Sequence, residues 1–362
     1  MQASVPNRPV FGMQKSSVVL VGLGRIASSL EKDPYRQKPC THAGVIFSPW
    51  GKKRFLFAGG IDPNPEKRNR FLAQWKLRPE FVGASPSELK LINRIPDLAV
   101  IATPTESHYQ DAMEWIEAGT KNLLIEKPVC ETYLQAKDLE RASRKKGVRI
   151  WVNHERRYHP KYAWAKQVLD SGKYGPIRII RASVLTSALS PGRAYKGRTG
   201  PLFHDGTHAV DLIHWILGKP DRIRSVFHRR KGIPIEDRAL ALLEYKDGPV
   251  VFLEAGGARS YFQFEVDIMT EKARILLSND GSVLFESKPS RRYKGFNSLT
   301  EVSFPKKFSL GSNPFQNLYA SVGQVLQGQS ERITGDISEN LEIMELLDKI
   351  KRKAEVRTIG EK

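Results

Sequence analysis

Residues 17–27 constrain the fold more than any other part of the chain. Their sequence, SVVLVGLGRIA, is an apolar β-branched run that breaks into Gly-x-Gly-x-x-Ala and then continues as a helix-like segment. Gly22 permits a tight turn after a strand, Gly24 lets the backbone approach a pyrophosphate, and Ala27 lets the helix pack closely. The helix N-terminus then favours the phosphates. The expected cofactor-binding residues of this dinucleotide site are Gly22, Leu23, Gly24, Arg25 and Ile26.

Strand-like and helix-like runs alternate over the first part of the chain, which is typical of βαβ units and a parallel sheet. Strands are expected at residues 18–21, 55–61, 98–102, 122–125 and 148–152, and helices at 25–31, 66–75, 107–118 and 132–146. We therefore predict a doubly wound parallel sheet of the Rossmann type over residues 16–152. Residues 1–15 lack the long apolar core of a signal peptide and are expected to form a flexible N-terminus.

The pattern changes after residue 152, and a chain of 362 residues has room for a second domain. A helix is expected at residues 160–172, followed by strands at 177–184, 223–229, 239–245, 250–256, 262–269, 273–277 and 282–286. The fold class is therefore α/β, with a C-terminal α+β domain over residues 153–335 built on a large, mostly antiparallel open sheet. Residues 336–362 contain an amphipathic helix that we expect to pack back on the body.

One spacing departs from the simplest dinucleotide-binding unit. The acidic residue after the second strand usually follows the glycines by about 20 residues. Here Asp62 lies 40 positions after Gly22. The additional residues, 33–53, are expected to form an extended loop after the first helix. The sequence does not decide between two roles for this loop: it forms a wall near the substrate, or it contacts another subunit.

The chain is strongly basic, with 58 Lys and Arg residues against 39 Asp and Glu and a formal net charge of +19. The basic residues are scattered and form no long tract with interleaved aromatic residues, so we expect no nucleic-acid partner. A phosphorylated or carboxylated substrate would suit this charge, and so would a merely solvated surface.

Neither a membrane partner nor a disulfide framework is expected. No apolar run reaches the roughly 20 residues that span a bilayer. Cys40 and Cys130 are the two cysteines of the chain and are far apart in sequence. This pattern favours a cytoplasmic location, where thiols stay reduced.

Three further segments carry the chemistry: ATPTESH at residues 102–108, EKP at 126–128 and HDGTHAVD at 204–211. Together with the glycine turn they resemble the glucose–fructose oxidoreductase and inositol dehydrogenase (Gfo/Idh/MocA) family over most of residues 16–355. The resemblance implies an NAD(P)-dependent oxidoreductase whose Lys127 contacts both nicotinamide and substrate. Further cofactor contacts are expected at Thr103, Pro104, Thr105, His108, Glu126, Lys127 and Asn153.

The residues also support this chemistry on their own. Oxidising an alcohol needs a base that titrates near neutrality, and His208 is the candidate, in the first turn of a helix expected at 207–217. Asp211 lies one turn further on and could orient the imidazole. Lys127 follows the strand at 122–125, where ligands bind in open α/β sheets, and could hydrogen-bond the substrate hydroxyl.

The sequence departs from the commonest family pattern at the acid four residues before the histidine. That position holds His204, and the acid is shifted to Asp205. Either Asp205 takes the role of the acid, or His204 does and Asp205 caps the helix. His204 and His208 have a spacing that can bind metal, but they lack an obvious third ligand, so no metal site is expected. Arg157, Tyr158 and His204 are candidates for substrate contact.

Cofactor choice depends on Asp62, because a carboxylate there accepts hydrogen bonds from the ribose hydroxyls of NAD. Lys67 and Arg68 could instead accommodate NADP. We expect NAD, with a polyhydroxylated and in part anionic substrate such as a sugar, sugar derivative or cyclitol. A homodimer or homotetramer would form through the C-terminal sheet. Two alternatives are a regulatory protein that binds dinucleotide without turnover, and a net non-redox enzyme with tightly held NAD.

Overall fold

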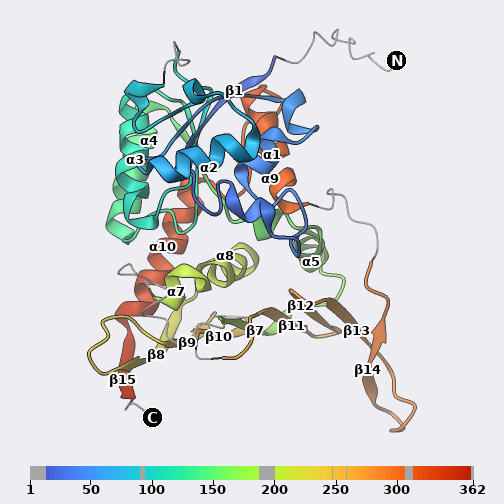
Figure 1. Ribbon diagram of the computed structural model, residues 1–362. Coiled ribbons are helices and arrows are strands. Elements are labelled where there is room, and N and C mark those ends of the chain that lie inside the picture. The colour runs from blue at the N-terminus through green and yellow to red at the C-terminus, as the bar shows by residue number, and fades with distance from the viewer. Residues whose placement is uncertain are drawn as a thin grey trace, which may run out of the picture.

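The computed structural model describes residues 14–89, 94–186, 200–246, 248–257, 259–305 and 313–359. Two sheets form separate layers, with helices between them and around the first sheet (Figure 1). Residues 1–13, most of the N-terminal segment expected to be flexible, lie outside the described residues. The same is true of residues 360–362 at the other end of the chain.

The first sheet has six parallel strands in the order β3-β2-β1-β4-β5-β6. They are β1 (Ser16–Val21), β2 (Phe55–Ile61), β3 (Val82–Gly83), β4 (Leu98–Ile101), β5 (Asn122–Ile125) and β6 (Arg149–Val152). β4 and β5 are buried at every residue, which explains why they read as continuous apolar runs. The predicted doubly wound sheet is confirmed.

Helices α2 (Pro65–Trp75), α3 (Thr105–Glu117) and α4 (Tyr133–Lys146) connect these strands. Their boundaries follow local sequence signals. Asn64 caps α2 by accepting from two backbone N–H groups, and Thr132 forms a capping box with Gln135 at the start of α4. α4 ends at Gly147, which has a left-handed conformation with φ of 62°.

The prediction of an α-helix at residues 25–31 is wrong. The chain forms turns there and a short 3-10 helix, Ser29–Lys32, while the first α-helix, α1 (His42–Phe47), lies inside the predicted loop at 33–53. The backbone N–H groups of His42 and Ala43 donate to the carbonyls of Ile26 and Ala27 at 3.2 and 2.9 Å. Those carbonyls are therefore bound by α1 instead of propagating a helix from the glycine turn.

The second sheet has nine strands in the order β14-β13-β12-β11-β7-β10-β9-β8-β15. They are β7 (Ile177–Leu185), β8 (Arg222–Arg230), β9 (Arg238–Glu244), β10 (Val250–Gly256), β11 (Gln263–Thr270), β12 (Ala273–Ser278), β13 (Ser282–Pro289), β14 (Asn297–Val302) and β15 (Ala354–Ile359). β7–β10 and β8–β15 pair in parallel, and the other pairs are antiparallel. The predicted, mostly antiparallel sheet is confirmed.

The described residues after β6 also form the helices α5 (Pro160–Asp170), α7 (Pro201–His204), α8 (Gly206–Leu217), α9 (Pro314–Leu326) and α10 (Ile337–Arg352). α7 and α8 pack on one face of the nine-stranded sheet, and α10 contacts α4 and β6 as well as α8 and β8. α10 therefore joins the two layers (Figure 1). The apolar spacing predicted α10, whereas α9, β14 and β15 were missed.

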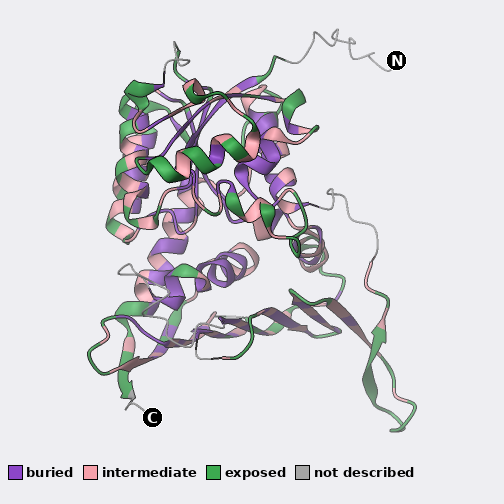
Figure 2. Cartoon of the chain, viewed as in Figure 1, coloured by how far each residue is buried: buried purple, intermediate pink, exposed green. Residues whose placement is uncertain are grey.

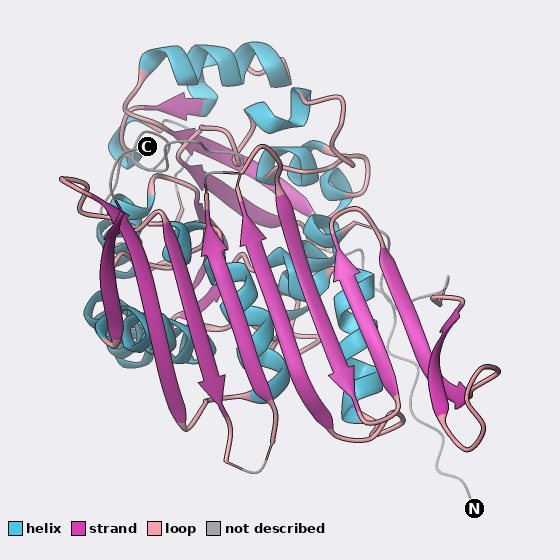
Figure 3. Ribbon diagram, turned by 90° about the horizontal axis from the view of Figure 1, so that it is seen from below, coloured by secondary structure: helices cyan, strands magenta, loops and turns pink. Residues whose placement is uncertain are grey.

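The opposite face of the nine-stranded sheet is left uncovered by the described part of the chain (Figure 3). Burial alternates along strand β9, so every second residue of this strand faces the open side of the sheet. Figure 2 colours the chain by burial. Among the helices that the structure describes, none has the length and apolar character of a membrane span.

Candidate active site

The turn after β1 has the geometry of a phosphate-binding loop. Gly22 has φ of 87°, and a Cβ there would lie 2.7 Å from the Ala102 carbonyl oxygen, so only glycine fits. A Cβ on Gly24 would meet no described atom within 4 Å, which leaves the backbone open to a ligand. Among hydrogen bonds within the described residues, none uses the N–H groups of Gly24, Arg25 or Ile26. The loop therefore fits a pyrophosphate.

Asp62 lies at the end of β2, directly beside this loop. Its Oδ2 accepts from the Leu23 N–H at 2.9 Å, and its Oδ1 accepts from the Asn64 N–H at 2.9 Å. The Lys67 ammonium is 3.5 Å from Oδ2, and Arg68 donates to the Asp62 carbonyl at 2.7 Å. The carboxylate thus ties the loops after β1 and β2 together, with two cations next to it.

His108 contacts the backbone of both loops, the one after β4 and the one after β5. This side chain is buried, and its ring nitrogens lie 2.8 Å from the Thr103 carbonyl and 2.9 Å from the Pro128 carbonyl. Thr103 also donates its hydroxyl to Asp111 at 2.6 Å, while Pro104 precedes the first residue of α3, Thr105. His108 therefore shapes both loops, and its own nitrogens face backbone carbonyls.

Lys127 extends from the end of β5 to the start of α8 in the other layer. Its Nζ donates to the His204 carbonyl at 2.8 Å and lies 3.8 Å from Asp205 Oδ1. The same oxygen is 3.1 Å from His204 Nδ1. Asp205 occupies the N-cap position of α8, but its side chain makes no capping hydrogen bond within the described structure. Of the two readings, the one in which Asp205 caps the helix is wrong.

His208 lies in the first turn of α8 and is 8% exposed. Burial lowers its pKa well below 6.5, and the positive charges of Lys127 and Arg156 lower it further. Its Nδ1 is buried without a hydrogen bond in the described structure, and the nearest carboxylate oxygen, Glu155 Oε2, is 3.7 Å away. The expectation that His208 titrates near neutrality is therefore not met, because its pKa lies well below that range and the neutral imidazole is favoured.

Arg157 and Tyr158, expected as substrate contacts, are instead interior residues. Arg157 is 2% exposed, and its Nε donates to both carboxylate oxygens of Asp211 at 3.0 Å. The Tyr158 hydroxyl donates to the Thr334 carbonyl at 2.7 Å. Asp211 is thus bound to a guanidinium across 54 residues of sequence, and the expectation that it orients His208 is wrong. An unpaired buried carboxylate would be costly, which explains this pairing.

Arg156, the residue next to Arg157, was not among the site residues predicted from the sequence. Its guanidinium lies 3.5 Å from the centre of the Phe264 ring, and its charge acts on His208. Nη1 donates to Asn279 at 3.3 Å, whereas Nε is buried and unpartnered within the described residues. No carboxylate of the described residues forms an ion pair with it. A signal was available, because residues 154–157 directly follow the carboxyl end of a parallel strand.

A second cation, Lys161 of α5, lies near Arg156. Burial, followed by the charge of Arg156, lowers the pKa of Lys161 to about 8. Lys161 donates to the Ser278 carbonyl, and the next residue, Tyr162, packs edge-on against Phe264. The charge of Arg156 thus acts on both His208 and Lys161.

Glu126 and Asn153 lie beneath Lys127 at the ends of β5 and β6. Glu126 accepts a hydrogen bond from the Asn153 amide and another from His42 Nε2 at 2.9 Å. The Lys127 backbone N–H points to its second oxygen at 3.3 Å. Both residues are buried, so they support the loop that carries Lys127.

Cysteine and metal chemistry find no support in the described residues. Cys40 and Cys130 are free and buried, and burial raises their pKa values to about 11 and about 12. Within the described ranges, His, Cys, Asp and Glu side chains form no group of three or more that could hold a metal ion. The two thiols are therefore structural side chains.

Comparison with known proteins identifies the family. Residues 16–154 match the model of the oxidoreductase family with an NAD-binding Rossmann fold, and residues 162–276 match the GFO/IDH/MocA C-terminal domain. The two matches together cover well over half of the chain in the expected order. The chain belongs to the Gfo/Idh/MocA family of oxidoreductases and has its NAD-binding Rossmann domain.

Individual relatives are more distant. The uncharacterized oxidoreductase YhhX of Escherichia coli (strain K12) is 33% identical over 171 residues, covering 44% of this chain and 48% of YhhX. The scyllo-inositol 2-dehydrogenase (NADP(+)) IolW of Bacillus subtilis (strain 168) is 28% identical over 165 residues, covering 44% of this chain and 46% of IolW. The chain thus spans about half the length of these curated relatives.

The WlbA dehydrogenase of Bordetella pertussis, solved with NADH and UDP-GlcNAcA, is similar in structure with a TM-score of 0.72. It is 23% identical, and the match covers 94% of this chain and 96% of WlbA. At this identity the similarity establishes the fold and leaves the substrate open.

Proposed function

We propose that this protein is an NAD(P)-dependent dehydrogenase that oxidises a secondary alcohol of a sugar, sugar derivative or cyclitol, or reduces the corresponding ketone. One observation carries the proposal: the Lys127 ammonium reaches the start of α8, and its charge acts on the buried, neutral imidazole of His208. Removing a proton from an alcohol requires a neutral base to accept it and a donor that stabilises the oxygen. His208 and Lys127, from the two layers, would supply these groups.

In the proposed mechanism, His208 is the base. Because Nδ1 faces Glu155, Nε2 is the nitrogen that accepts the hydroxyl proton, and the Glu155 carboxylate stabilises the resulting imidazolium. The Lys127 ammonium keeps N–H groups free of its bond to the His204 carbonyl, and one of them would donate a hydrogen bond to the substrate oxygen and stabilise the negative charge that develops there. The Asp205 carboxylate forms an ion pair with the Lys127 ammonium. A bound NAD would supply the hydride acceptor for this oxidation.

The phosphate groups of the cofactor would lie at the loop of Gly22, Leu23, Gly24, Arg25 and Ile26. Asp62 supports NAD, because its carboxylate opposes a 2′-phosphate. Lys67 at 3.5 Å reduces that repulsion, so discrimination against NADP is expected to be modest. The loops of Thr103, Pro104 and Thr105 flank the expected nicotinamide position.

The substrate is expected to be polyhydroxylated and to carry an anionic group. Arg156 supports this proposal, because a cation that no described carboxylate pairs with lies beside His208 and is held in place by Phe264. Lys161 adds to the positive charge of the same region. A carboxylate or phosphate of the substrate would complete the missing ion pair.

The test is a turnover screen of the full chain with NAD and with NADP, in which NADH or NADPH absorbance is followed. The panel contains inositols, neutral sugars, sugar acids, sugar phosphates and UDP-GlcNAcA. The proposal predicts reduction of the dinucleotide with a member of this panel. Tight dinucleotide binding without net reduction, or a product formed with NAD retained and unreduced, would contradict it.

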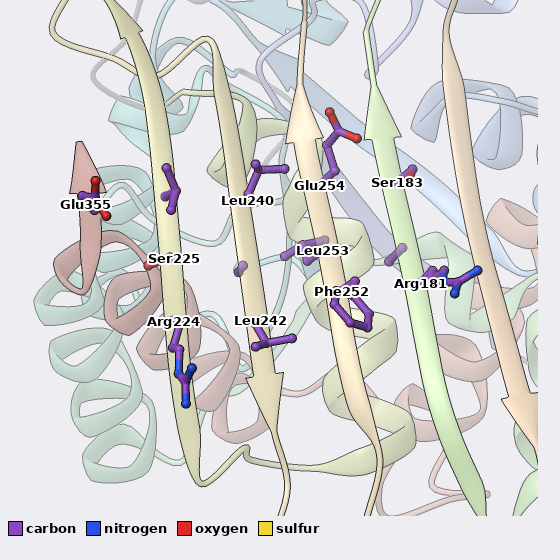
Figure 4. A pocket seen from close by; sticks show the side chains of 13 residues that line it. Arg181, Ser183, Arg224, Ser225, Leu240, Leu242, Phe252, Leu253, Glu254 and Glu355 are labelled. Atoms are coloured by element: carbon purple, nitrogen blue, oxygen red, sulfur yellow. The ribbon is translucent and has the colours of Figure 1, made fainter. Parts of the chain in front are cut away.

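We also propose that the protein is a cytoplasmic homodimer or homotetramer assembled through the nine-stranded sheet. A hollow on its uncovered face is lined by Leu240, Leu242 and the 47%-exposed Phe252, with Arg181 and Arg224 on either side (Figure 4). Exposed apolar surface of this kind supports a contact with another sheet. Light scattering at defined protein concentrations tests it, and a monomer at all concentrations would contradict it.

A further inference from the structure

The additional residues at 33–53 place a histidine in the interior of the protein. α1 begins there, and His42, its first residue, is fully buried. Neither of the two positions left open by the sequence, a substrate wall or a subunit contact, needs a buried histidine. His42 instead packs between the rings of Phe315 and Tyr319 of α9, with ring centres 5.7 and 5.9 Å away.

Both ring nitrogens of His42 have polar partners. Nδ1 lies 2.8 Å from the Tyr319 hydroxyl, and Nε2 lies 2.9 Å from Glu126 Oε1. A carboxylate can only accept, so Nε2 carries the hydrogen and donates it to Glu126. The other carboxylate oxygen, Oε2, faces the backbone N–H of Lys127 at 3.3 Å. A continuous chain of polar contacts therefore runs from α1 through Glu126 to Lys127.

The charge of Glu126 depends on this contact. Burial by itself would raise the pKa of Glu126, but the hydrogen bond and charge of His42, the Asn153 amide and the charge of Lys127 together lower it. The titratable groups that act on or contact Glu126 are His42 of α1, Tyr319 of α9, Lys127, His154 and Glu155. Without His42, burial would dominate and favour the protonated carboxyl.

We propose that His42 is a positioning residue for the reaction: it orients Glu126, and Glu126 in turn holds the loop that presents Lys127 to the substrate. The inference rests on the proposed function, since it needs Lys127 to act on a substrate. It also assigns a role to the extended spacing between Gly22 and Asp62. The carbonyls of Ile26 and Ala27 bind the first amides of α1, so the same helix also supports the phosphate loop.

The test compares three variants with the wild type, using the substrate found in the screen. His42→Phe keeps a ring but removes the donor to Glu126, and His42→Gln keeps an amide donor. Tyr319→Phe is the matched control, because it removes the other contact of His42 and leaves Glu126 bonded. A buried hydrogen bond to a charged group implies that His42→Phe lowers kcat about 10- to 100-fold. NADH binding, followed by fluorescence, should stay within about threefold.

The pH profile separates positioning from mere stability. In His42→Phe the acid limb of kcat should move to higher pH, because Glu126 becomes easier to protonate. In Tyr319→Phe both kcat and the acid limb should stay close to the wild type, even if its melting temperature falls. His42→Gln should recover most of the lost kcat. If His42→Phe is recovered unfolded, His42→Asn, too short to reach Glu126, replaces it with the same expected loss.

Wild-type kcat and an unshifted acid limb in the donor-free variants would overturn the inference. Equal losses in His42→Phe, His42→Gln and Tyr319→Phe that parallel their melting temperatures would also overturn it. A wild-type protein that turns over no member of the panel contradicts the proposed function instead, so the two failures are distinguishable.

Discussion

Replacing Arg156 by Gln removes the positive charge beside His208 while keeping a polar side chain of similar reach. In the structure, Arg156 stacks on Phe264 at 3.5 Å and its Nε is buried and unpartnered within the described residues. Its side-chain hydrogen bond to Asn279 is 3.3 Å long and is therefore weak. The change should consequently leave the fold intact and act on the substrate.

The magnitude follows from the group that is lost. A hydrogen bond between a guanidinium and an anionic group contributes about 1.5–3 kcal/mol, which corresponds to roughly a 10- to 150-fold change in kcat/KM. Neutral members of the panel cannot use this contact, so their kcat/KM should change less than about threefold. Loss of the charge should also raise the pKa of His208 and move the acid limb of kcat/KM to higher pH.

The assay is steady-state dinucleotide reduction with an anionic and a neutral substrate of the same panel, each across pH. Arg141→Gln is the control, because Arg141 is exposed on α4 and its ion-pair partner is Asp138 of the same helix, outside the candidate site. It should leave both substrates and the pH profile unchanged. If Arg156→Gln slows anionic and neutral substrates equally and the acid limb does not move, the assignment of Arg156 is refuted.

Three further predictions follow from the site. Because the pKa of His208 lies well below 6.5 and its neutral form is the base, alcohol oxidation should persist below pH 6.5 in a pH–rate profile, and an acid limb above 6.5 would contradict this. Gly22→Ala should abolish NADH binding measured by fluorescence, since its Cβ would lie 2.7 Å from a carbonyl oxygen in a backbone with φ of 87°; unchanged binding would contradict the loop assignment. Lys67→Gln should raise the preference for NAD over NADP by about tenfold in kcat/KM, because it unmasks Asp62, and a shift toward NADP would contradict it.

Much of the parallel sheet could be predicted because its strands are buried on both faces. β4 is apolar at every position and β5 at all but its first, so they are visible without knowledge of their neighbours. The short α1 and the strand β14 were not visible in the same way. β14 is exposed along most of its length and shows no alternation, and it forms only by pairing with β13.

The residues of the candidate site also differ in how far the sequence alone could reveal them. Lys127 and His208 stood out because each lies at a strand end or helix start with residue types suited to proton transfer. Arg157 was expected to contact the substrate and His42 was not singled out, because their partners, Asp211 and Glu126, are 54 and 84 residues away in sequence. Buried pairs of this kind are set by tertiary packing, and local pattern carries no information about them.

The most direct test of the account is a double-mutant cycle of kcat/KM on Lys127→Met and His208→Asn, with NADH binding measured for all four proteins. Each single variant should lose about 100-fold or more while keeping NADH affinity, since both groups act on one proton transfer. The double variant should then be scarcely slower than the slower single variant. Losses that multiply, or a Lys127→Met protein with wild-type turnover, would contradict the claim that the two side chains act on the same substrate oxygen.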